Sequence, residues 1–417
     1  MHSSNRKKRR LIMVSFDAVT SVEAEEKLWH MPNFRALAER GTYVGGVSSV
    51  LMTHTYVVHS SVITGCLPEK HRIYDNVPFQ PHEAHPVWNH WDRAVQVPTL
   101  YQQAEKAGLR CAGILWPVSA GARMRWNMPE VLPAPGQSQA SASIKNGSLF
   151  YQLSAILRHG KLMNGISQPE LDDFSAAVAC DTIRRQKPDL LLLHFTDVDT
   201  HKHRCGVKSE EVQAALERLD QRLGLLMQAV REAGTEEETG LLVFSDHGAF
   251  DVHTHINLND ALERMGLCKQ GEKGVIERGY RACFWQSDGC AYMHVNDKSE
   301  EAEIVSAVCS ELKKIKGVAR FLIREEMKAA ALDSFSLGVE AELGYYFYRH
   351  PLSDKAVHGY SPLHENYQTF YAAAGCGVRA GQRLCGGCVT DICAAAARML
   401  NVEPWPMDGK APEGMFE

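Results

Sequence analysis

The chain has 417 residues, of which 45% are hydrophobic and 23% are charged, a composition typical of globular proteins. Its formal net charge of −5 argues against a general nucleic-acid binder, which would present a basic surface. No apolar run is long enough to span a bilayer as a helix, so we expect neither a membrane nor a nucleic-acid duplex as a partner.

The N-terminal segment is a basic run, Arg6 to Arg10, followed by the apolar residues LIMVSF. The apolar run is too short for the core of a signal peptide, and it ends at Asp17 without a small-residue cleavage site. We therefore predict a first buried strand at residues 11–16 behind a solvated basic flank. The 12 scattered cysteines fit reduced thiols, so we expect a cytoplasmic protein.

The segments that follow alternate between helix and strand. The helix at residues 209–233 has the clearest pattern, because Ser209 can cap it, apolar side chains recur at helical spacing, and Gly234 can end it. The nearly continuous apolar strand at 190–195 suits a sheet that is covered on both faces. Further helices are predicted at 31–40, 56–64, 98–107, 172–186 and 390–400, and further strands at 111–115 and 241–244. This alternation predicts an α/β fold with a mostly parallel central sheet between helices.

Residues 267–349 interrupt this alternation with strand-like GCAYMHV and GYYFYR segments and an amphipathic helix at 300–316. We predict that they form a smaller inserted α+β subdomain. The catalytic core would then comprise residues 1–266 and 350–417. The stretch 133–148, rich in Ala, Ser, Gly and Pro, is predicted to be an exposed loop.

Acidic and imidazole side chains follow three of the predicted strands. Asp17 follows the first strand, Asp199 and His203 follow the strand LLLLHF, and Asp246 and His247 follow LLVF. Ligand sites of open parallel sheets lie at the carboxyl ends of strands, so these groups should converge. Zinc accepts both carboxylate and imidazole ligands, and two divalent ions would offset the repulsion among the three acids.

Taken singly, each of these residues has an ordinary structural role as an alternative. Asp17 alone would be read as a cap or turn residue, and Asp199 with His203, four residues apart, as a surface ion pair. His194 and His201 are not expected to be ligands, although one of them can support the site or lie in the core. The convergence of three strands is what favours a metal site.

The segment THTYVVHSSVITG supplies a nucleophile, Thr55, directly before a predicted helix. Backbone N–H groups at a helix N-terminus favour an anion there, and a metal-bound hydroxyl can be deprotonated to attack phosphorus. The competing role for Thr55 is that of a helix cap. Asn76 is a candidate hydrogen-bond donor to the phosphoryl oxygens, or else an ordinary loop residue.

At this point the chain resembles a known family. The segments LIMVSFDAV, THTYVVHSSVITGCLPEKHRIYDN, CAGILWPVS, TDVDTHKHRCG, FSDHGAFD and VHGYSP, in this order, are similar to the alkaline phosphatase superfamily, and within it to the nucleotide pyrophosphatase/phosphodiesterase branch. The resemblance covers nearly the whole chain, up to the closing TDICAAAARMLNVEPWPMDG.

The resemblance implies a role for each matching residue. One zinc ion would be held by Asp17, Thr55, Asp246 and His247, and the other by Asp199, His203 and His358. Asn76 matches the asparagine that holds the phosphoryl group, Tyr56 matches an aromatic wall of the substrate pocket, and Trp116 lies in a segment similar to the family's WPGS. The assignment of His358 as a metal ligand rests on the resemblance alone.

The resemblance predicts a two-metal phosphodiesterase or nucleotide pyrophosphatase that acts through a phospho-threonine intermediate, with zinc as the expected metal. The expected partner is a small-molecule phosphoester substrate, which can be a nucleotide. The segment THTYVVH departs from the family's Thr-Phe-Pro-Asn-His and leaves the substrate open, with Trp88 and Trp91 as further candidate pocket walls. One alternative is a carbon–phosphorus hydrolase resembling phosphonoacetate hydrolase, for which Arg123 or Arg125 would have to approach the pocket. Two others are a phosphomonoesterase or phosphate-group transferase, and a metal-binding protein without catalysis.

Overall fold

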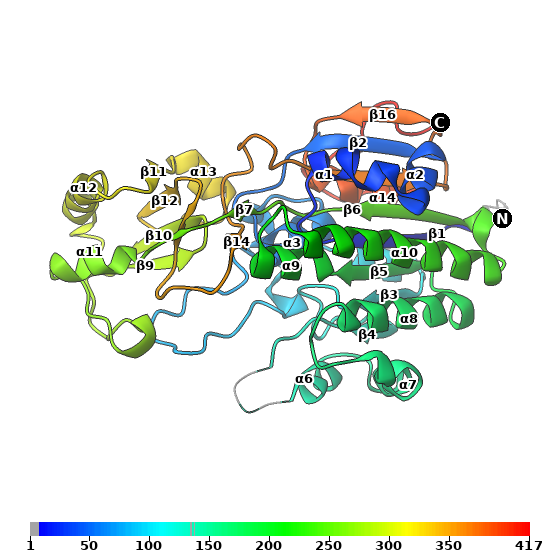
Figure 1. Ribbon diagram of the computed structural model, residues 1–417, viewed down its shortest axis with the longest axis horizontal. Helices are drawn as coiled ribbons and strands as arrows, with labels where there is room; N and C mark the ends of the chain where they lie inside the picture. Colours follow the sequence, from blue (N-terminus) through cyan, green and yellow to red (C-terminus); the bar gives the residue numbers. More distant parts are fainter. Residues whose placement is uncertain (1–7, 134–135, 137) are drawn as a thin grey trace.

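The structure is a computed structural model that describes residues 8–133, 136 and 138–417. An eight-stranded sheet forms its centre (Figure 1). In spatial order its strands are β16 (Gln382–Cys385), β2 (Thr42–Val47), β15 (Thr369–Ala374), β6 (Thr239–Phe244), β1 (Arg10–Phe16), β5 (Leu190–Phe195), β3 (Cys111–Ile114) and β4 (Trp126–Met128). All neighbouring pairs are parallel except those of β15 with β2 and β6. The predicted mostly parallel sheet is therefore confirmed.

Helices cover both faces of this sheet because successive side chains of a strand point to opposite sides. On β1, Leu11 and Met13 join one apolar cluster while Ile12 and Val14 join the other. The first cluster packs under α3 (Thr55–Thr64), α5 (Leu100–Lys106) and α14 (Thr390–Leu400). The second packs under α2 (Pro32–Glu39), α8 (Glu170–Arg185) and α10 (Glu210–Glu232). Burial on both sides explains why the central strands read as continuous apolar runs.

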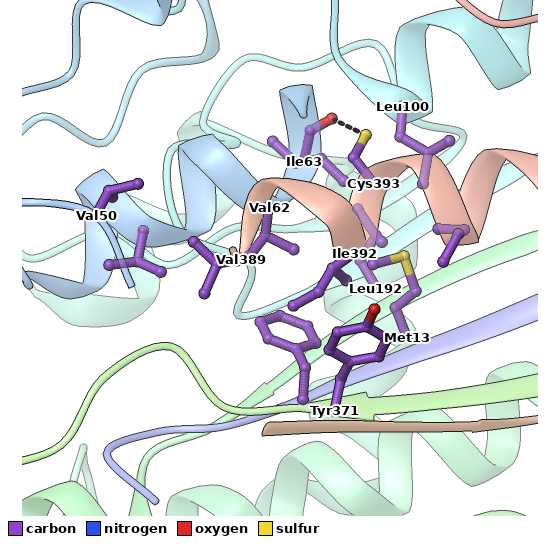
Figure 2. Close-up of a cluster of buried hydrophobic side chains, with 14 of the residues drawn as sticks. Met13, Val50, Val62, Ile63, Leu100, Leu192, Tyr371, Val389, Ile392 and Cys393 are labelled. Atoms are coloured by element: carbon purple, nitrogen blue, oxygen red, sulfur yellow. Dashed lines mark hydrogen bonds between the residues drawn. The ribbon is translucent and has the colours of Figure 1, made fainter. Parts of the chain in front are cut away.

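Figure 2 shows how α14 closes the first face of the sheet. Its Ile392 and Cys393 lie between α3 and the sheet residues Met13, Leu192 and Tyr371, and the Cys393 thiol donates to the carbonyl of Ile63 at 3.5 Å. Tight packing of the C-terminal helix against α3 thus supports the helix that begins at Thr55.

Helix α2 is capped from a neighbouring helix rather than from its own sequence. Its N-cap residue Met31 provides no side-chain hydrogen bond. Instead, the buried carboxylate of Asp220 on α10 accepts from the backbone N–H groups of Asn33 at 3.1 Å and Phe34 at 2.7 Å. A carboxylate beside a helix N-terminus also interacts favourably with the helix dipole.

Replacing Asp220 with alanine should lower the free energy of unfolding by about 2–4 kcal/mol, because two buried N–H groups lose their acceptor. Asp220→Asn retains an acceptor oxygen and should lose roughly half as much. Urea denaturation measures both, with the exposed Asp333→Ala as a control. Equal losses for the alanine and asparagine variants would contradict this account of the cap.

A smaller unit stands beside the main sheet (Figure 1). It contains an antiparallel sheet in the order β11 (Val318–Phe321), β12 (Leu337–Ala341), β10 (Cys290–Val295) and β9 (Ala282–Ser287), with helices α11 (Leu258–Arg264), α12 (Glu301–Leu312) and α13 (Arg324–Ala329). Its apolar cluster begins at Leu258 and reaches Tyr367, beyond both ends of the predicted insertion at 267–349. The domain boundaries at 266/267 and 349/350 stay a prediction.

Further α-helices and strands lie outside these two sheets and the helices that cover them. They are α1 (Ser21–Glu26), α4 (Pro68–His71), α6 (Gln139–Lys145), α7 (Leu149–His159), α9 (Asp197–Cys205), β7 (Phe250–Asp251), β8 (Thr254–Ile256), β13 (Tyr345–Phe347) and β14 (Ala356–Val357). No helix in the described part of the chain is both long and apolar enough to cross a membrane.

Three expectations from the sequence need correction. The stretch 133–148 is not simply a loop, because α6 forms within it, with the Ser138 side chain accepting from the backbone N–H of Ser141. Helix α12 ends at Leu312, short of the predicted residue 316. Arg10 is not a solvated flank: it is 7% exposed and its guanidinium pairs with Asp189 at 3.1 Å. Arg6 and Lys7 lie outside the described residues.

Candidate active site and metal centre

The predicted site residues meet at the carboxyl ends of β1, β5 and β6. Asp17 follows β1, Asp199 and His203 lie on α9 directly after β5, and Asp246 with His247 follows β6. These residues form two groups whose possible ligand atoms lie within 4.8 Å of one another. The convergence expected for an open parallel sheet is therefore present.

The first group consists of Asp17, Asp246 and His247. All three are buried, with exposed fractions of 3% or less. Thr55 is the first residue of α3, and its hydroxyl oxygen lies 3.3 Å from Nε2 of His247. The fold thus brings the candidate nucleophile to the first group.

The second group consists of Asp199, His203 and His358. Nε2 of His203 lies 3.4 Å from a carboxylate oxygen of Asp199, and its Nδ1 lies 3.4 Å from Asp354. The rings of His358 and His247 have centroids 4.2 Å apart, so the two groups are neighbours. His358, which the residues alone did not identify, follows the two-residue strand β14 after the chain returns from the smaller unit.

Buried polar atoms without partners test whether these residues fit metal ions. Within the described residues, one carboxylate oxygen on each of Asp17, Asp199 and Asp246 is buried and accepts no hydrogen bond. A buried carboxylate oxygen that accepts no hydrogen bond is costly, and bound cations would offset that cost. Carboxylate and neutral imidazole together are the donor set that zinc and similar divalent ions accept. The residues therefore fit divalent metal ions.

In the protein alone, burial and neighbouring charges shift the pKa values of Asp17 and His358. Burial, together with the charges of Asp246 and Asp199, raises the pKa of Asp17 well above its usual value. Burial, followed by neighbouring His247 and His54, lowers the pKa of His358 well below its usual value and leaves its imidazole neutral, as a metal ligand must be. The acids repel one another, and cations between them would relieve that repulsion.

His194 supports the first group from behind. Its Nε2 lies 3.0 Å from Asp17 and its Nδ1 lies 2.9 Å from Glu130, so it links the two carboxylates. Such contacts orient metal-binding carboxylates. This agrees with the expectation that one of His194 and His201 supports the site or lies in the core. His201 contacts Asp197 instead and belongs to neither group.

Asn76 lies next to the start of α3. Its side-chain oxygen accepts from the backbone N–H of Tyr56 at 2.8 Å. This contact fixes the side chain beside Thr55, and within the described residues its amide N–H₂ group has no hydrogen-bond partner. Asn76 therefore has a free donor, and the residue lines the adjoining cavity.

Tyr56 and Trp116, predicted to line the substrate pocket, lie elsewhere. Both are fully buried, and neither lines the cavity beside Asn76. On a helix, the residue after Thr55 points about 100° away from it, which directs Tyr56 into the core, where its hydroxyl donates to Glu130. Trp116 packs against His59 and Phe244. Their expected place is taken by Trp88, which contacts Tyr56 at a ring distance of 5.4 Å.

The cavity beside Asn76 has a volume of about 210 Å³. Its walls include Trp88, Trp285 and Tyr348, while His54, Asp75 and Asp288 lie at its polar end. Nδ1 of His54 lies 3.3 Å from Asp75, whose other oxygen accepts from Tyr292 at 2.5 Å. Burial alone would lower the pKa of His54, but Asp75 reverses this effect, and the pKa is raised.

Sequence reasoning missed these polar residues. Asp288 lies in the turn between β9 and β10 of the smaller unit, far from the strand ends of the main sheet. No spacing rule connects it to the site. His54 and Asp75 each stand next to a residue that was singled out, and that adjacency was the only available signal.

Comparisons with known proteins agree with this geometry. A model of the type I phosphodiesterase/nucleotide pyrophosphatase family matches residues 11–361. Venom phosphodiesterase from Macrovipera lebetinus is 25% identical over 249 residues, which cover 57% of this chain and 25% of that protein. Ectonucleotide pyrophosphatase/phosphodiesterase family member 1 from Homo sapiens is 25% identical over 231 residues, which cover 52% of this chain and 21% of that protein. The matched region is thus about a quarter of the length of these relatives.

Solved structures share the fold. Murine ectonucleotide pyrophosphatase/phosphodiesterase 5, solved as an inactive form in complex with AMP, superimposes with a TM-score of 0.70 over 97% of this chain and 98% of that chain, at 17% identity. The human protein of the same name superimposes with a TM-score of 0.70 at 18% identity. The superposition covers 96% of this chain and 97% of the human chain. Since the family model spans most of the sequence, the chain belongs to the type I phosphodiesterase/nucleotide pyrophosphatase family of the alkaline phosphatase superfamily.

Proposed function

We propose that the chain is a metal-dependent phosphodiesterase that hydrolyses phosphodiester or phosphoanhydride bonds, with Thr55 as its nucleophile. The observation that carries this proposal is the position of the Thr55 hydroxyl, 3.3 Å from Nε2 of His247 and beside two adjacent carboxylate–imidazole groups. The AMP bound to the murine structural neighbour supports a nucleotide as the substrate.

Asp17, Thr55, Asp246 and His247 would hold one ion, and Asp199, His203 and His358 the other. Two bound divalent ions, with zinc as the expected metal, would acidify the Thr55 hydroxyl and offset negative charge on the phosphoryl group. Elemental analysis together with a chromogenic diester assay tests this proposal. Protein that hydrolyses the diester without any divalent ion would contradict it.

The chain's own groups account for the two steps. The Thr55 oxygen forms a bond to phosphorus as the bond to the first ester oxygen breaks, and that oxygen leaves as an alcohol with the Thr55 proton. Water then attacks the phospho-threonine diester, the Thr55 oxygen regains a proton, and a phosphomonoester is released. The free N–H₂ group of Asn76 can donate to a non-bridging phosphoryl oxygen throughout, and the N-terminus of α3 favours the negative charge.

Diesters should be hydrolysed at least about tenfold better, in kcat/KM, than monoesters, because the extra charge of a monoester calls for a cation beside the phosphoryl oxygens. The donor identified here, Asn76, is neutral. Among the described residues lining the cavity, His54 pairs with Asp75, and Arg349 donates to the carbonyls of Glu83 and Ala84. The comparison uses a nitrophenyl nucleotide diester and nitrophenyl phosphate, and a preference for the monoester would refute the substrate assignment.

The aromatic wall of the cavity predicts that the protein distinguishes aromatic diesters from small alkyl diesters. Trp88→Ala should weaken hydrolysis of an aromatic diester more than that of a small alkyl diester, because stacking contributes about 1 kcal/mol. Trp126→Ala, at the far edge of the sheet, is the control. Equal effects on both diesters would show that Trp88 does not contact the leaving group.

The other candidate functions lack a supporting observation. Arg123 and Arg125, which a phosphonoacetate hydrolase-like site would place near the substrate, are both exposed, and neither lines the cavity. A metal-binding protein without catalysis would bind two ions yet leave the diester intact, so the assay above separates it from an enzyme.

A further inference from the structure

Large apolar side chains are exposed on helix α7 (Leu149–His159) and on the segment that follows it. Phe150 and Leu157 are 85% and 86% exposed. The same stretch exposes four more large apolar residues: Leu149, Leu153, Leu162 and Ile166. Elsewhere in the described residues, exposed large apolar side chains occur singly and well separated in sequence. We call these six residues the α7 patch, and a concentration of exposed apolar side chains of this kind marks a contact site.

The helical part of the patch is a single stripe. At about 100° per residue, Leu149, Phe150, Leu153 and Leu157 fall within an arc of about 100° around α7. The opposite side of the helix contains Gln152, which is 1% exposed. A surface helix usually turns an apolar stripe of this width towards the protein core. On α7 the stripe faces solvent, so it has no partner among the described residues.

The other side of α7 fixes the helix to the catalytic core. It packs against β4, the edge strand of the main sheet, and against α8, so that it lies at the outer margin of the core (Figure 1). The Tyr151 hydroxyl forms a hydrogen bond with that of Thr182 at 2.8 Å. The Gln152 side chain donates to the carbonyl of Ser143 at 3.1 Å. The stripe is therefore presented on a helix that is firmly attached.

The region around the patch is basic. Residues 138–169 contain Lys145, Arg158 and Lys161 but no Asp or Glu. Lys145 and Lys161 are exposed, and their side chains form no ion pair with described residues. Arg158 shares the carboxylate of Asp181 with Arg185, at 2.7 and 2.5 Å, so a positive charge remains in excess there. Since the whole chain has a net charge of −5, this face differs in sign from the rest and suits an anionic partner.

The composition of the patch distinguishes among possible partners. A second copy of the chain, paired through α7, would bring Lys145 and Lys161 close to the same residues of the first copy, and like charges would oppose the contact. Protein interfaces rely on Trp, Tyr and Arg and on direct hydrogen bonds, whereas the patch contains only Leu, Ile and Phe. Leu and Phe on one helical face with flanking Lys and Arg are typical of helices that lie at a membrane surface.

We propose that the α7 patch docks the protein on an anionic lipid membrane. Helix α7 lies in the plane of the interface, with Phe150 and Leu157 among the acyl chains and with Lys145 and Lys161 at the lipid phosphates. The expectation of no membrane partner rested on the lack of a spanning segment, and a helix that lies on the surface needs none. This inference does not depend on the proposed phosphodiesterase function.

Vesicle flotation of the full, metal-loaded chain tests this docking surface. The vesicles contain phosphatidylcholine alone or mixed with phosphatidylserine, and the wild type should bind the mixed vesicles more tightly. A variant with both Phe150→Ser and Leu157→Ser should lose at least about tenfold in partition coefficient, because two exposed apolar side chains no longer enter the bilayer. Lys161→Glu should lose about tenfold on the mixed vesicles only, and high salt should weaken wild-type binding.

Matched variants elsewhere on the surface serve as controls. Leu225→Ser combined with Leu343→Ser removes two exposed apolar side chains outside the patch, and Lys316→Glu reverses an exposed charge on the smaller unit. Both should bind like wild type, and circular dichroism should show all variants folded. Wild type that ignores the mixed vesicles, or a Phe150/Leu157 variant that keeps full affinity, would overturn the proposal.

Two further measurements address the other partners. Light scattering that finds a dimer, which the Phe150/Leu157 variant abolishes while vesicle binding is absent, would assign the patch to a second copy. Binding to polyglutamate without binding to vesicles would assign it to an acidic protein. Either result would overturn the membrane assignment, whereas a monomer that binds only the vesicles supports it.

Discussion

Thr55→Ala is expected to lower kcat/KM for a nitrophenyl nucleotide diester by roughly 10³-fold or more, because it removes the attacking oxygen. The metal content should stay close to that of wild type, since Asp17, Asp246 and His247 remain in place. Steady-state kinetics and elemental analysis on the same preparations measure both quantities.

Two controls separate the nucleophile from the helix that carries it. Thr55→Ser keeps a hydroxyl, so it should retain most of the wild-type activity that Thr55→Ala loses. Ser60→Ala removes another buried hydroxyl of α3, one that donates to the carbonyl of Tyr56, and should leave turnover near wild type. A Thr55→Ala variant with near-normal turnover would exclude a covalent mechanism through this residue.

Removing the divalent ions is expected to abolish activity reversibly, and the intact protein should bind close to two ions per chain. His203→Ala should lower the stoichiometry by about one ion, because the second group loses an imidazole. His201→Ala is the matched control on the same helix: its ring contacts Asp197, outside both groups. Equal metal content in the two variants would contradict the assignment of the second site.

Much of the fold was predictable because its core strands are nearly continuous apolar runs. The strand at 190–195 and the helix capped by Ser209 appear where the sequence places them, with the Ser209 side chain accepting from the N–H of Val212. Helix α6 was less visible, because short Ala- and Ser-rich segments have weak periodicity. The Ser138 side chain caps its N-terminus.

The carboxylates of the candidate site were the easiest residues to predict, because they follow strands. Asp17, Asp199 and Asp246 can be recognised from the sequence because each follows a predicted strand, and a parallel sheet brings such residues together at one edge. His358 and Asp288 come instead from a two-residue strand and from a hairpin turn, whose positions depend on tertiary packing of the smaller unit. The resemblance assigned Tyr56 to the pocket wall, but the residue after Thr55 lies on another face of α3 and is buried in the core.

The stereochemical course at phosphorus tests the central claim most directly. A P-chiral nitrophenyl nucleoside phosphorothioate would be hydrolysed in ¹⁸O-labelled water, and the configuration of the product determined. Each in-line displacement inverts phosphorus, so two successive displacements through Thr55 predict net retention. Net inversion would show that water attacks the substrate directly and would contradict the phospho-threonine mechanism.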